Sequence, residues 1–259
     1  MTTLLIDGDT FVYRFAAAAT EYVDWGNGLW VSFANEHKAT YLMERAIEEL
    51  QASLQATEIE VAISSPTCFR KDIDPTYKEN RKKREPLLLY KALRLAMERK
   101  FPTHMLARLE ADDVLGIWAT TPTEKDVVIV SVDKDLRQIP GKHFNPGHPE
   151  EGIQEVSQWE GELFFYRQVL SGDASDHYAG CPRIGPLGAK NILGGAQTHH
   201  ECWERIIKTY AKAGIHDASK IIRQARLARI LRYGEYAALE GPKLWMPPTT
   251  PSTNSLASN

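Results

Sequence analysis

The sequence predicts an α/β protein with a mostly parallel central sheet, and two observations support this fold class. Short apolar runs at 4–6, 60–64 and 127–132 have the length and composition of buried strands. Amphipathic stretches lie between these runs, which is the alternation expected of βαβ units. The run VVIVSV at 127–132 is the clearest buried strand in the chain.

The other elements follow from periodicity and turn residues. Residues 36–55 place apolar side chains on one side of a helix. A second amphipathic helix begins near Pro86, because proline is tolerated in a first helical turn. Residues 105–109 predict a short strand, and residues 111–120 predict a helix with an acidic first turn. Helical spacing continues at 159–170, 185–193, 202–213 and 218–240, and we expect no strand after Gly172.

These elements suggest two structured parts and a tail. We expect residues 1–171 to form the α/β core, which includes a basic segment at 74–100. Residues 172–246 are expected to form a small helical subdomain. The last residues, 247–259, are PPTTPSTNSLASN and carry too little apolar surface to fold, so we expect them to be disordered.

The composition points to a soluble protein of a reducing compartment. No apolar run among the 259 residues approaches the roughly 20 needed to span a bilayer, and the first residues lack a secretion signal. Cys68, Cys181 and Cys202 are far apart and form no disulfide framework. We therefore expect a cytoplasmic location and no membrane partner.

Charge is unevenly distributed along the chain. The net charge is only -3, but residues 78–100 hold nine Lys and Arg against three Glu, and residues 204–232 hold eight against two acids. Such runs are often solvated helix faces. Here two basic strips accompany clustered acids, which is the charge distribution expected of a nucleic-acid enzyme.

The acids are the strongest functional indication. They form four close-spaced clusters: Asp7-Gly8-Asp9, Glu110-Ala111-Asp112-Asp113, Asp133-Lys134-Asp135 and Asp173-Ala174-Ser175-Asp176. Each cluster alone is better explained by a turn, a charged first helical turn or a helix cap. Turns and caps explain the four clusters taken together less well. Acids at the carboxyl ends of parallel strands meet at one edge of the sheet and repel one another unless a cation lies between them. Two Mg²⁺ ions suit this number of carboxylates, and ion pairs of this kind cleave phosphodiesters.

Two further segments are suited to nucleic acid. Residues 75–84 combine Tyr77, which could stack on an unpaired base, with dense positive charge that would neutralise phosphates. The glycine-rich turn at 180–190 leads into a helix whose amino terminus attracts anions. The chain contains no GxxxxGK[ST], HExxH or GxSxG motif that would indicate another chemistry.

With these motifs the chain resembles the 5′-nuclease (flap endonuclease) superfamily, and most closely the free-standing exonucleases of short-tailed bacteriophages. The matching motifs occur in family order and span nearly the whole chain: LIDGD at 5–9, DPTYKENRKK at 74–83, LEADDV at 109–114, SVDKDL at 131–136, LSGDASDHYAG at 170–180 and IGPLGAKNIL at 184–193. The resemblance implies a PIN-like core with a helical arch, and a C-terminal helical subdomain with a helix–hairpin–helix element at 180–193.

The resemblance also implies the site. Two Mg²⁺ or Mn²⁺ ions would be surrounded by Asp7, Glu110, Asp112, Asp113, Asp133, Asp135, Asp173 and Asp176. The catalytic residues would be Lys78 and Arg81 at the base of the arch, with Asp7, Glu110, Asp112 and Asp133. The hairpin would contact duplex DNA, with K⁺ as a helper. The DNA-binding residues would be Tyr77, Lys78, Arg81, Lys82, Lys83, Arg84, Gly185, Gly188 and Lys190.

One departure concerns the end of the second core strand, where the family usually has an aspartate. Ser65 lies at about that place and carries no charge. Asp9 has no firm counterpart and is expected to be an indirect ligand or a turn acid. The expected substrate is DNA with a 5′ end or flap, and RNA–DNA hybrid is a further candidate. Two alternatives stay open, a PIN-type ribonuclease and a structure-specific DNA-binding protein without activity.

Overall fold

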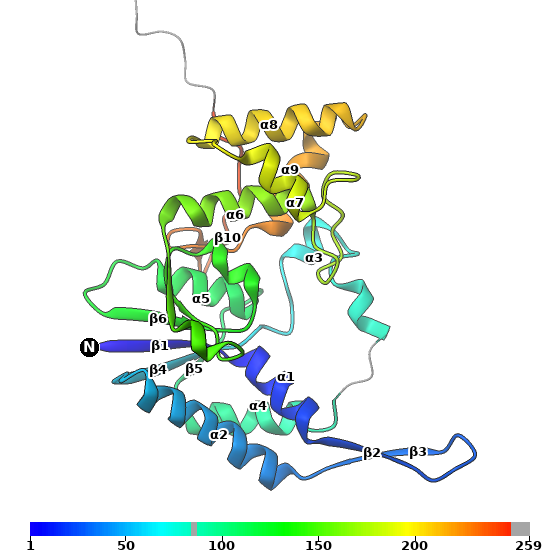
Figure 1. The fold of residues 1–259 in the computed structure, drawn as a ribbon, viewed down its shortest axis with the longest axis vertical. Helices are drawn as coiled ribbons and strands as arrows, with labels where there is room; N and C mark the ends of the chain where they lie inside the picture. The colour runs from blue at the N-terminus through cyan, green and yellow to red at the C-terminus, as the bar shows by residue number, and fades with distance from the viewer. Residues whose placement is uncertain (84–86, 250–259) are drawn as a thin grey trace, which may run out of the picture. The chain divides into compact units, whose positions relative to one another are not determined.

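The computed structural model describes residues 1–83 and 87–249, with the side chains of residues 82 and 83 outside the description (Figure 1). The chain divides into two compact units. Unit 1 comprises residues 1–69, 83–160 and 230–243, and unit 2 comprises residues 70–82, 161–229 and 244–259. The domains expected from the sequence, 1–171 and 172–246, have other limits than these two units and stay a prediction.

Unit 1 is built on a six-stranded sheet, which confirms the predicted fold class. Its strands are β1 (Thr2–Asp7), β4 (Glu58–Ala62), β5 (Thr103–His104), β6 (Asp126–Val130), β7 (Gly141–Phe144) and β8 (Ile153–Val156). The order is β5-β4-β1-β6-β7-β8, and all neighbours are parallel except β7 and β8. Central β1 pairs Asp7 with Ala62 and Ile6 with Val130, so the carboxyl ends of β1, β4 and β6 meet at one edge.

Helices cover both faces of this sheet (Figure 1). Three of them, α1 (Gly8–Ala19), α2 (Glu36–Ser53) and α4 (Tyr90–Lys100), pack together on one face. Their buried side chains, such as Phe11, Met43 and Met97, form one core with Leu4 and Ile6 of β1. Helix α5 (Ala111–Ala119) packs against β1, β4 and β6 on the other face. Short 3₁₀ turns lie at Glu79–Lys83, Lys134–Gln138 and Pro149–Glu151.

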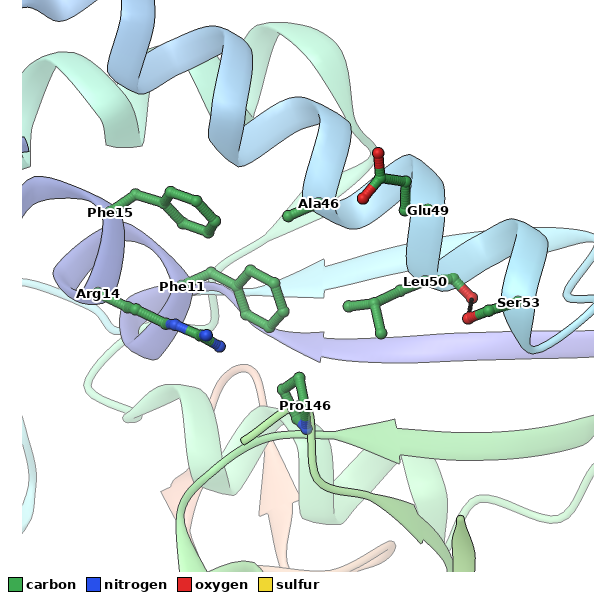
Figure 2. Close-up of a pocket in the computed structure, with 8 residues that line it drawn as sticks. All are labelled: Phe11, Arg14, Phe15, Ala46, Glu49, Leu50, Ser53 and Pro146. Carbon is green, nitrogen blue, oxygen red and sulfur yellow. Dashed lines mark hydrogen bonds between the residues drawn. The ribbon is translucent and has the colours of Figure 1, made fainter. Parts of the chain in front are cut away.

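A hollow of about 300 Å³ lies between α1, α2 and the loop that follows β7 (Figure 2). Phe11, Phe15 and Leu50 give it an apolar wall, and Arg14 and Pro146 lie at its side. The residues that line it include none of the site residues predicted from the sequence.

A hairpin between α1 and α2 was not expected from the sequence. It consists of β2 (Thr20–Asp24) and β3 (Trp30–Ala34), paired antiparallel. Gly26, Asn27 and Gly28 all have positive φ in its turn, a conformation that glycine and asparagine tolerate best. The hairpin extends away from the sheet and keeps Trp25 and Trp30 exposed (Figure 1).

Unit 2 is helical, as the sequence predicted for this part of the chain. Its helices are α3 (Arg70–Ile73), α6 (Gln158–Ser171, whose first turn belongs to unit 1), α7 (Pro186–Leu193), α8 (His199–Lys212) and α9 (Ala218–Ala228). The segment after residue 243 returns to this unit, where the Trp245 ring lies 5.4 Å from that of Phe165 and 5.2 Å from that of Trp203. Buried Arg70 donates from Nε to the Leu227 carbonyl at 3.0 Å and so ties α3 to α9.

Two strand predictions need correction. The strand predicted at 105–109 lies earlier, at Thr103–His104, because β5 pairs with the end of β4 there and the chain then turns towards α5. Strands also occur after Gly172, contrary to expectation: β9 (Tyr236–Ala237) and β10 (Gly241–Pro242) form a small antiparallel pair. Each has only two residues, too few for periodicity to be visible in the sequence.

Two helix predictions were too long. The helix predicted at 218–240 ends at Ala228, because the next residues are extended and their main-chain N–H groups bond to side chains instead of continuing the helix. Ile230 N–H donates to Gln138 Oε1 at 3.2 Å, and Leu231 N–H donates to Asp113 Oδ1 at 3.1 Å. The helix predicted from near Pro86 begins at Tyr90, and residues 84–86 lie outside the description.

Most of the predicted tail, residues 250–259, also lies outside the described part of the chain. Within the residues that the structure does describe, no helix is both long and apolar enough to cross a membrane.

Candidate active site

Asp7 is one of the predicted acids that are almost completely buried. It ends β1 and caps α1, where its Oδ1 accepts the Thr10 N–H at 3.1 Å. Its other oxygen, Oδ2, accepts the Ser131 hydroxyl at 2.7 Å. Gly8 makes this entry into α1 possible, because a Cβ at that position would lie 2.7 Å from Val61 Cγ1 and 2.8 Å from the Ala62 carbonyl oxygen.

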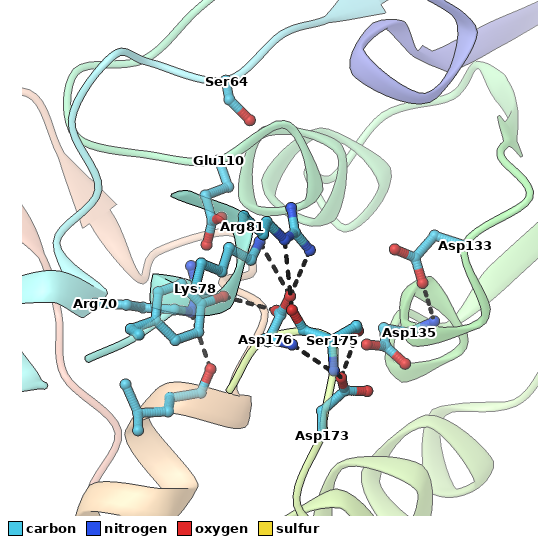
Figure 3. A network of polar contacts seen from close by, with 12 residues as sticks. Ser64, Arg70, Lys78, Arg81, Glu110, Asp133, Asp135, Asp173, Ser175 and Asp176 are labelled. Carbon is cyan, nitrogen blue, oxygen red and sulfur yellow. Dashed lines mark hydrogen bonds and ion pairs between the residues drawn. The ribbon is translucent and has the colours of Figure 1, made fainter. Parts of the chain in front are cut away.

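Ser131 connects Asp7 to the acids that follow β6. Besides donating to Asp7, the Ser131 Oγ accepts the Asp133 N–H at 2.9 Å. Asp133 in turn caps the following 3₁₀ turn, since its Oδ1 accepts the Asp135 N–H at 2.8 Å (Figure 3). Ser131 was not among the residues predicted from the sequence, although its position two residues before Asp133 at a strand end was a usable indication.

The electrostatics of this edge are unfavourable for ionised acids. Asp7 is only 1% exposed, and this burial is the largest of the causes that together raise the pKa of its carboxyl to about 6. The negative charges of Asp9 and Asp133 act in the same direction, while the bonds from Ser131 and Thr10 lower the pKa. A cation at this edge would relieve the unfavourable burial of the Asp7 charge.

The amino terminus of α5 brings a second group of acids into unit 1. Glu110 is the N-cap residue and forms a capping box with Asp113, whose Oδ2 accepts the Glu110 N–H at 3.3 Å. Ser64, which follows β4, accepts the Ala111 N–H on its Oγ at 2.9 Å. This bond fixes α5 at the edge where β1, β4 and β6 end. Asp112 is half-buried in the first turn of α5.

Asp113 is held differently from its neighbours. It is fully buried, and both of its oxygens accept main-chain N–H groups, from Glu110 and from Leu231. These bonds give it a structural function between α5 and the 230–243 segment. We therefore leave Asp113 out of the ligand set proposed below, and its metal-binding role stays a prediction.

Asp9 joins three segments near the site. Its Oδ2 accepts the Ser64 N–H at 3.0 Å, and its Oδ1 accepts the Tyr90 hydroxyl at 3.3 Å. Arg94 lies 3.9 Å from Asp9 and also donates to the Ser64 carbonyl at 2.9 Å. Ser64, Tyr90 and Arg94 were not predicted as site residues, because nothing local in the chain shows that α4 returns to the end of β4.

Ser65 is not the serine that lies closest to this arrangement. Its Oγ accepts the Arg108 N–H at 3.2 Å and the Thr67 N–H at 3.4 Å, so it holds the loop after β4. Ser64, one residue earlier, is the serine at the amino terminus of α5. The expectation that Ser65 replaces a family aspartate therefore concerns a residue whose hydroxyl is already used within its own loop.

Unit 2 carries the fourth acidic cluster in a closed loop. Asp173 and Tyr178 exchange main-chain hydrogen bonds of 2.9 and 3.1 Å across this loop. Gly172 and Gly180 flank it, both at φ +65°, and a Cβ on Gly180 would lie 2.2 Å from the Gly172 nitrogen. Only glycine permits this approach. Within the loop, Asp173 Oδ1 accepts the N–H groups of Ser175 and Asp176.

Asp176 is the meeting point of the predicted arch cations (Figure 3). Its Oδ1 lies 2.7 Å from Arg81 Nη2 and 3.4 Å from Lys78 Nζ, and its Oδ2 accepts the Tyr77 hydroxyl at 2.8 Å. Tyr77 is only 2% exposed. Its ring is therefore buried in this structure, which corrects the expectation of a surface aromatic for base stacking.

The hairpin at 180–193 presents its turn to solvent. Gly185 is the N-cap of α7, Pro186 follows at the first helical position, and the Ala189 side chain is buried beneath them. Gly185 and Lys190 are exposed, while Gly188 is half-buried. A Cβ on Gly185 would meet nothing within 4 Å, so this part of the backbone is open to a ligand.

The predicted metal ligands are oxygen donors, which suits a hard divalent cation such as Mg²⁺ or Mn²⁺. Across residues 1–83 and 87–249, no group of three His, Cys, Asp or Glu side chains is close enough together to hold an ion. Asp7, Asp133 and Asp173 instead accept hydrogen bonds from their own surroundings. Of the predicted DNA-binding residues, Arg84 and the side chains of 82 and 83 lie outside the description.

Comparison with known proteins gives one family and several relatives. Residues 2–158 match the family described as 5′-3′ exonuclease, N-terminal resolvase-like domain. The exodeoxyribonuclease of Enterobacteria phage T3 is 28% identical, with 94% of this chain and 92% of that protein aligned. The exonuclease of Escherichia phage T7 is 29% identical, with 94% and 93% aligned. The fold is similar to that of the phage T5 D15 protein co-crystallized with metal ions, at a TM-score of 0.65, 18% identity and coverage of 88% and 89%.

Proposed function

Because the chain belongs to the 5′-3′ exonuclease family, we propose that it hydrolyses phosphodiester bonds of DNA from 5′ ends or flaps with two divalent cations. The observation that carries this proposal is the carboxyl edge of β1 and β6. There Asp7 and Asp133 share the Ser131 hydroxyl, and the charge of Asp133 adds to the raised pKa of Asp7. The T3 relative is an exodeoxyribonuclease, and the T5 structure is of a protein crystallized with metal ions, which agrees with this proposal.

The residues proposed to bind metal directly are Asp7, Glu110, Asp112 and Asp133. Asp135, Asp173 and Asp176 are proposed to hold the second ion directly or through water. When bound, divalent cations of this kind lower the pKa of an attacking water and neutralise charge on the phosphate. Mg²⁺ is the proposed ion, with Mn²⁺ as a substitute, because both prefer oxygen ligands.

The chain's own residues position the substrate. Ser131 orients the Asp7 carboxyl group and fixes the Asp133 main chain at the edge of the sheet, and the Ser64 hydroxyl fixes α5 so that Glu110 is presented there. Lys78 and Arg81 are proposed to contact the scissile phosphate and stabilise the charge that develops on it. Water attacks in line, and the product carries a 5′-phosphate.

The hairpin at 180–193 is proposed to bind the backbone of the duplex at a point other than the bond that is cleaved. Its exposed Gly185 allows the backbone to approach a phosphate, Gly188 and Lys190 lie on the same helix, and the amino terminus of α7 favours an anion. K⁺ at this hairpin is part of the same proposal. The cleavage of RNA in RNA–DNA hybrids is a further activity that the same assays would test.

The test is cleavage of labelled DNA. A 5′-labelled flap duplex and a 5′-recessed duplex are incubated with the protein in Mg²⁺ or in EDTA, beside matched substrates with RNA in the labelled strand. Metal-dependent release of short 5′-labelled products supports the proposal and shows which end is preferred. Cleavage of RNA alone would favour a PIN-type ribonuclease. Tight binding with no product in either Mg²⁺ or Mn²⁺ would refute the enzyme proposal.

Two variants make this test specific. Asp133→Ala removes a proposed ligand and should abolish cleavage. Asp126→Ala removes a half-buried acid at the opposite end of β6, where it pairs with Lys142, and should leave cleavage intact. Equal activity in both variants would show that the acids at the carboxyl edge are not the catalytic ones.

A further inference from the structure

We propose that Arg81 and Lys78 form a charge gate on the proposed metal site at Asp176. In the protein without DNA they occupy the Asp176 carboxylate and weaken divalent-cation binding there. DNA phosphate draws them away and so strengthens it. This inference rests on the proposed function, which assigns a metal ion to Asp176 and phosphate contacts to Lys78 and Arg81.

The first support is the arrangement around Asp176. The two cations approach the same oxygen, Oδ1, at 2.7 Å for Arg81 and 3.4 Å for Lys78. Exposed ion pairs of a protein surface usually contribute little. This one is partly enclosed, with 17% of the Asp176 side chain and 15% of the Lys78 side chain exposed.

The second support is that the two loops are fixed to each other within unit 2. The Lys78 N–H donates to the Asp176 carbonyl at 3.0 Å, and the Asn80 amide donates to the Ala174 carbonyl at 2.9 Å. Lys78 has a φ of +55°, which a residue other than glycine seldom adopts. With the buried Tyr77 hydroxyl on Oδ2, these contacts hold both cations beside the carboxylate. The pairing is therefore a property of the folded loops.

The third step is electrostatic. A divalent ion bound to Asp176 would lie about 2 Å from a carboxylate oxygen, so it would come within about 5 Å of the Arg81 guanidinium. The divalent ion and the Arg81 guanidinium repel each other at this distance, and solvent weakens the repulsion because Arg81 is 47% exposed. The repulsion that remains should weaken the binding of the ion by about tenfold. Removing the Arg81 charge should strengthen the binding of an ion at Asp176 by that factor.

DNA should have the same effect as removing the charge. Phosphate oxygens compete with Asp176 for Arg81 and Lys78, and they cancel positive charge at the same time. Because coupling between two ligands is reciprocal, the ion must strengthen DNA binding by the factor by which DNA strengthens ion binding. The gate therefore keeps this site weak until a substrate is present.

The experiment measures Mn²⁺ binding to the full chain without DNA, from the electron paramagnetic resonance signal of free Mn²⁺. Four proteins are compared: wild type, Arg81→Gln, Asp176→Asn and the double variant. Lys212→Gln, at the exposed end of α8, is the matched control for loss of one positive charge in unit 2. Circular dichroism confirms that each protein is folded.

The gate predicts that Arg81→Gln tightens one class of Mn²⁺ site by about tenfold, that the gain disappears in the double variant and that Lys212→Gln changes nothing. Unchanged or weaker binding in Arg81→Gln, with weaker binding in Asp176→Asn, overturns the gate and leaves the metal assignment intact. If Asp176→Asn itself binds Mn²⁺ and cleaves DNA like wild type, Asp176 is not a ligand, and the gate fails together with that part of the proposed function.

Discussion

Replacing Asp7 with asparagine should stabilise the protein in the absence of metal, although the same change should abolish cleavage. Asp7 is fully buried and its pKa is raised from 3.8 to about 6, chiefly by that burial. Asparagine keeps the shape of the side chain and is an equally good helix N-cap, so α1 keeps its first hydrogen bond. What the variant removes is the buried charge.

The expected size follows from the pKa. The difference between 3.8 and about 6 corresponds to about 3 kcal/mol of folding free energy that is lost when Asp7 is ionised. With its oxygen on the Thr10 N–H, the amide presents an NH2 group to Ser131, so the Ser131 hydroxyl must accept this bond instead of donating it, and we expect this exchange to offset about 1 kcal/mol of the gain. We therefore expect the variant to be more stable than wild type by about 2 kcal/mol at pH 7.5 in EDTA.

The pH dependence of the free energy of unfolding provides a second test of the direction of this effect. The folded pKa of Asp7 is higher than the unfolded one, so the folded protein binds the additional proton between pH 3.8 and about 6. Wild-type stability contributed by this group is therefore fully present below pH 3.8 and is lost as the pH rises through about 6. The advantage of the variant should appear over the same window and be absent at its acidic end.

The assay is urea denaturation of wild type and Asp7→Asn in EDTA at several pH values. Asp126→Asn serves as a control of opposite sign, because Lys142 holds the pKa of Asp126 below its usual range and its ionised form is the favourable one. Added Mg²⁺ should stabilise wild type more than Asp7→Asn, since an ion bound to the folded state shifts the equilibrium. A variant that is less stable than wild type at pH 7.5 in EDTA would refute the reasoning.

Three further changes test other parts of the account. Gly8→Ala should destabilise unit 1 by about 1–3 kcal/mol in urea denaturation because its Cβ has no room at the end of β4, and wild-type stability would contradict this. Asp9→Asn should cost about 1–2 kcal/mol through weaker bonds to Ser64 and Arg94, and should lower the pKa of Asp7 in a carboxyl NMR titration; an unchanged titration would count against the proximity of the two acids. Trp245→Ala should lower the unfolding midpoint of unit 2 by removing an aromatic contact worth about 1–2 kcal/mol, and an unchanged midpoint would show that the segment after residue 243 does not stabilise this unit.

The sequence was sufficient to predict the central strands and most long helices. Buried parallel strands are continuous apolar runs, and β1, β4 and β6 show this directly. Strands β7 and β8 were not predicted, because each has only four residues and their sequences, such as IQEV, are too short and polar to show a strand pattern. The β2–β3 hairpin could have been found from Gly26-Asn27-Gly28 between two aromatic-rich runs, since such turns favour positive φ.

Tertiary contacts decided the features that periodicity could not. The apolar spacing of α9 continues through Leu227, Ile230 and Leu231, which is why the helix was predicted too long. It ends where Gln138 and Asp113 accept the next N–H groups, and both acceptors lie about a hundred residues away in sequence. Contacts of this separation leave no trace in local spacing.

The candidate site also contains some residues that the sequence could predict and others that it could not. The acids at strand ends were predicted, because the carboxyl edge of a parallel sheet is a general location for sites. The serines that bond to Asp7 and to the main chain beside the other acids, Ser131 and Ser64, were not predicted, and only the position of Ser131 two residues before Asp133 gave an indication. The burial of Tyr77 was also beyond the sequence, because it depends on the loop at 172–180 packing against residues 74–81.

The central claim is that the carboxyl edge of β1 and β6 binds the divalent cation used in cleavage. The most direct measurement is anomalous diffraction from crystals of the protein soaked in Mn²⁺. The account predicts an anomalous peak within coordination distance of the Asp7 and Asp133 carboxyl groups, which disappears in Asp133→Ala. Mn²⁺ peaks only elsewhere, from a protein that cleaves DNA with Mn²⁺, would contradict it.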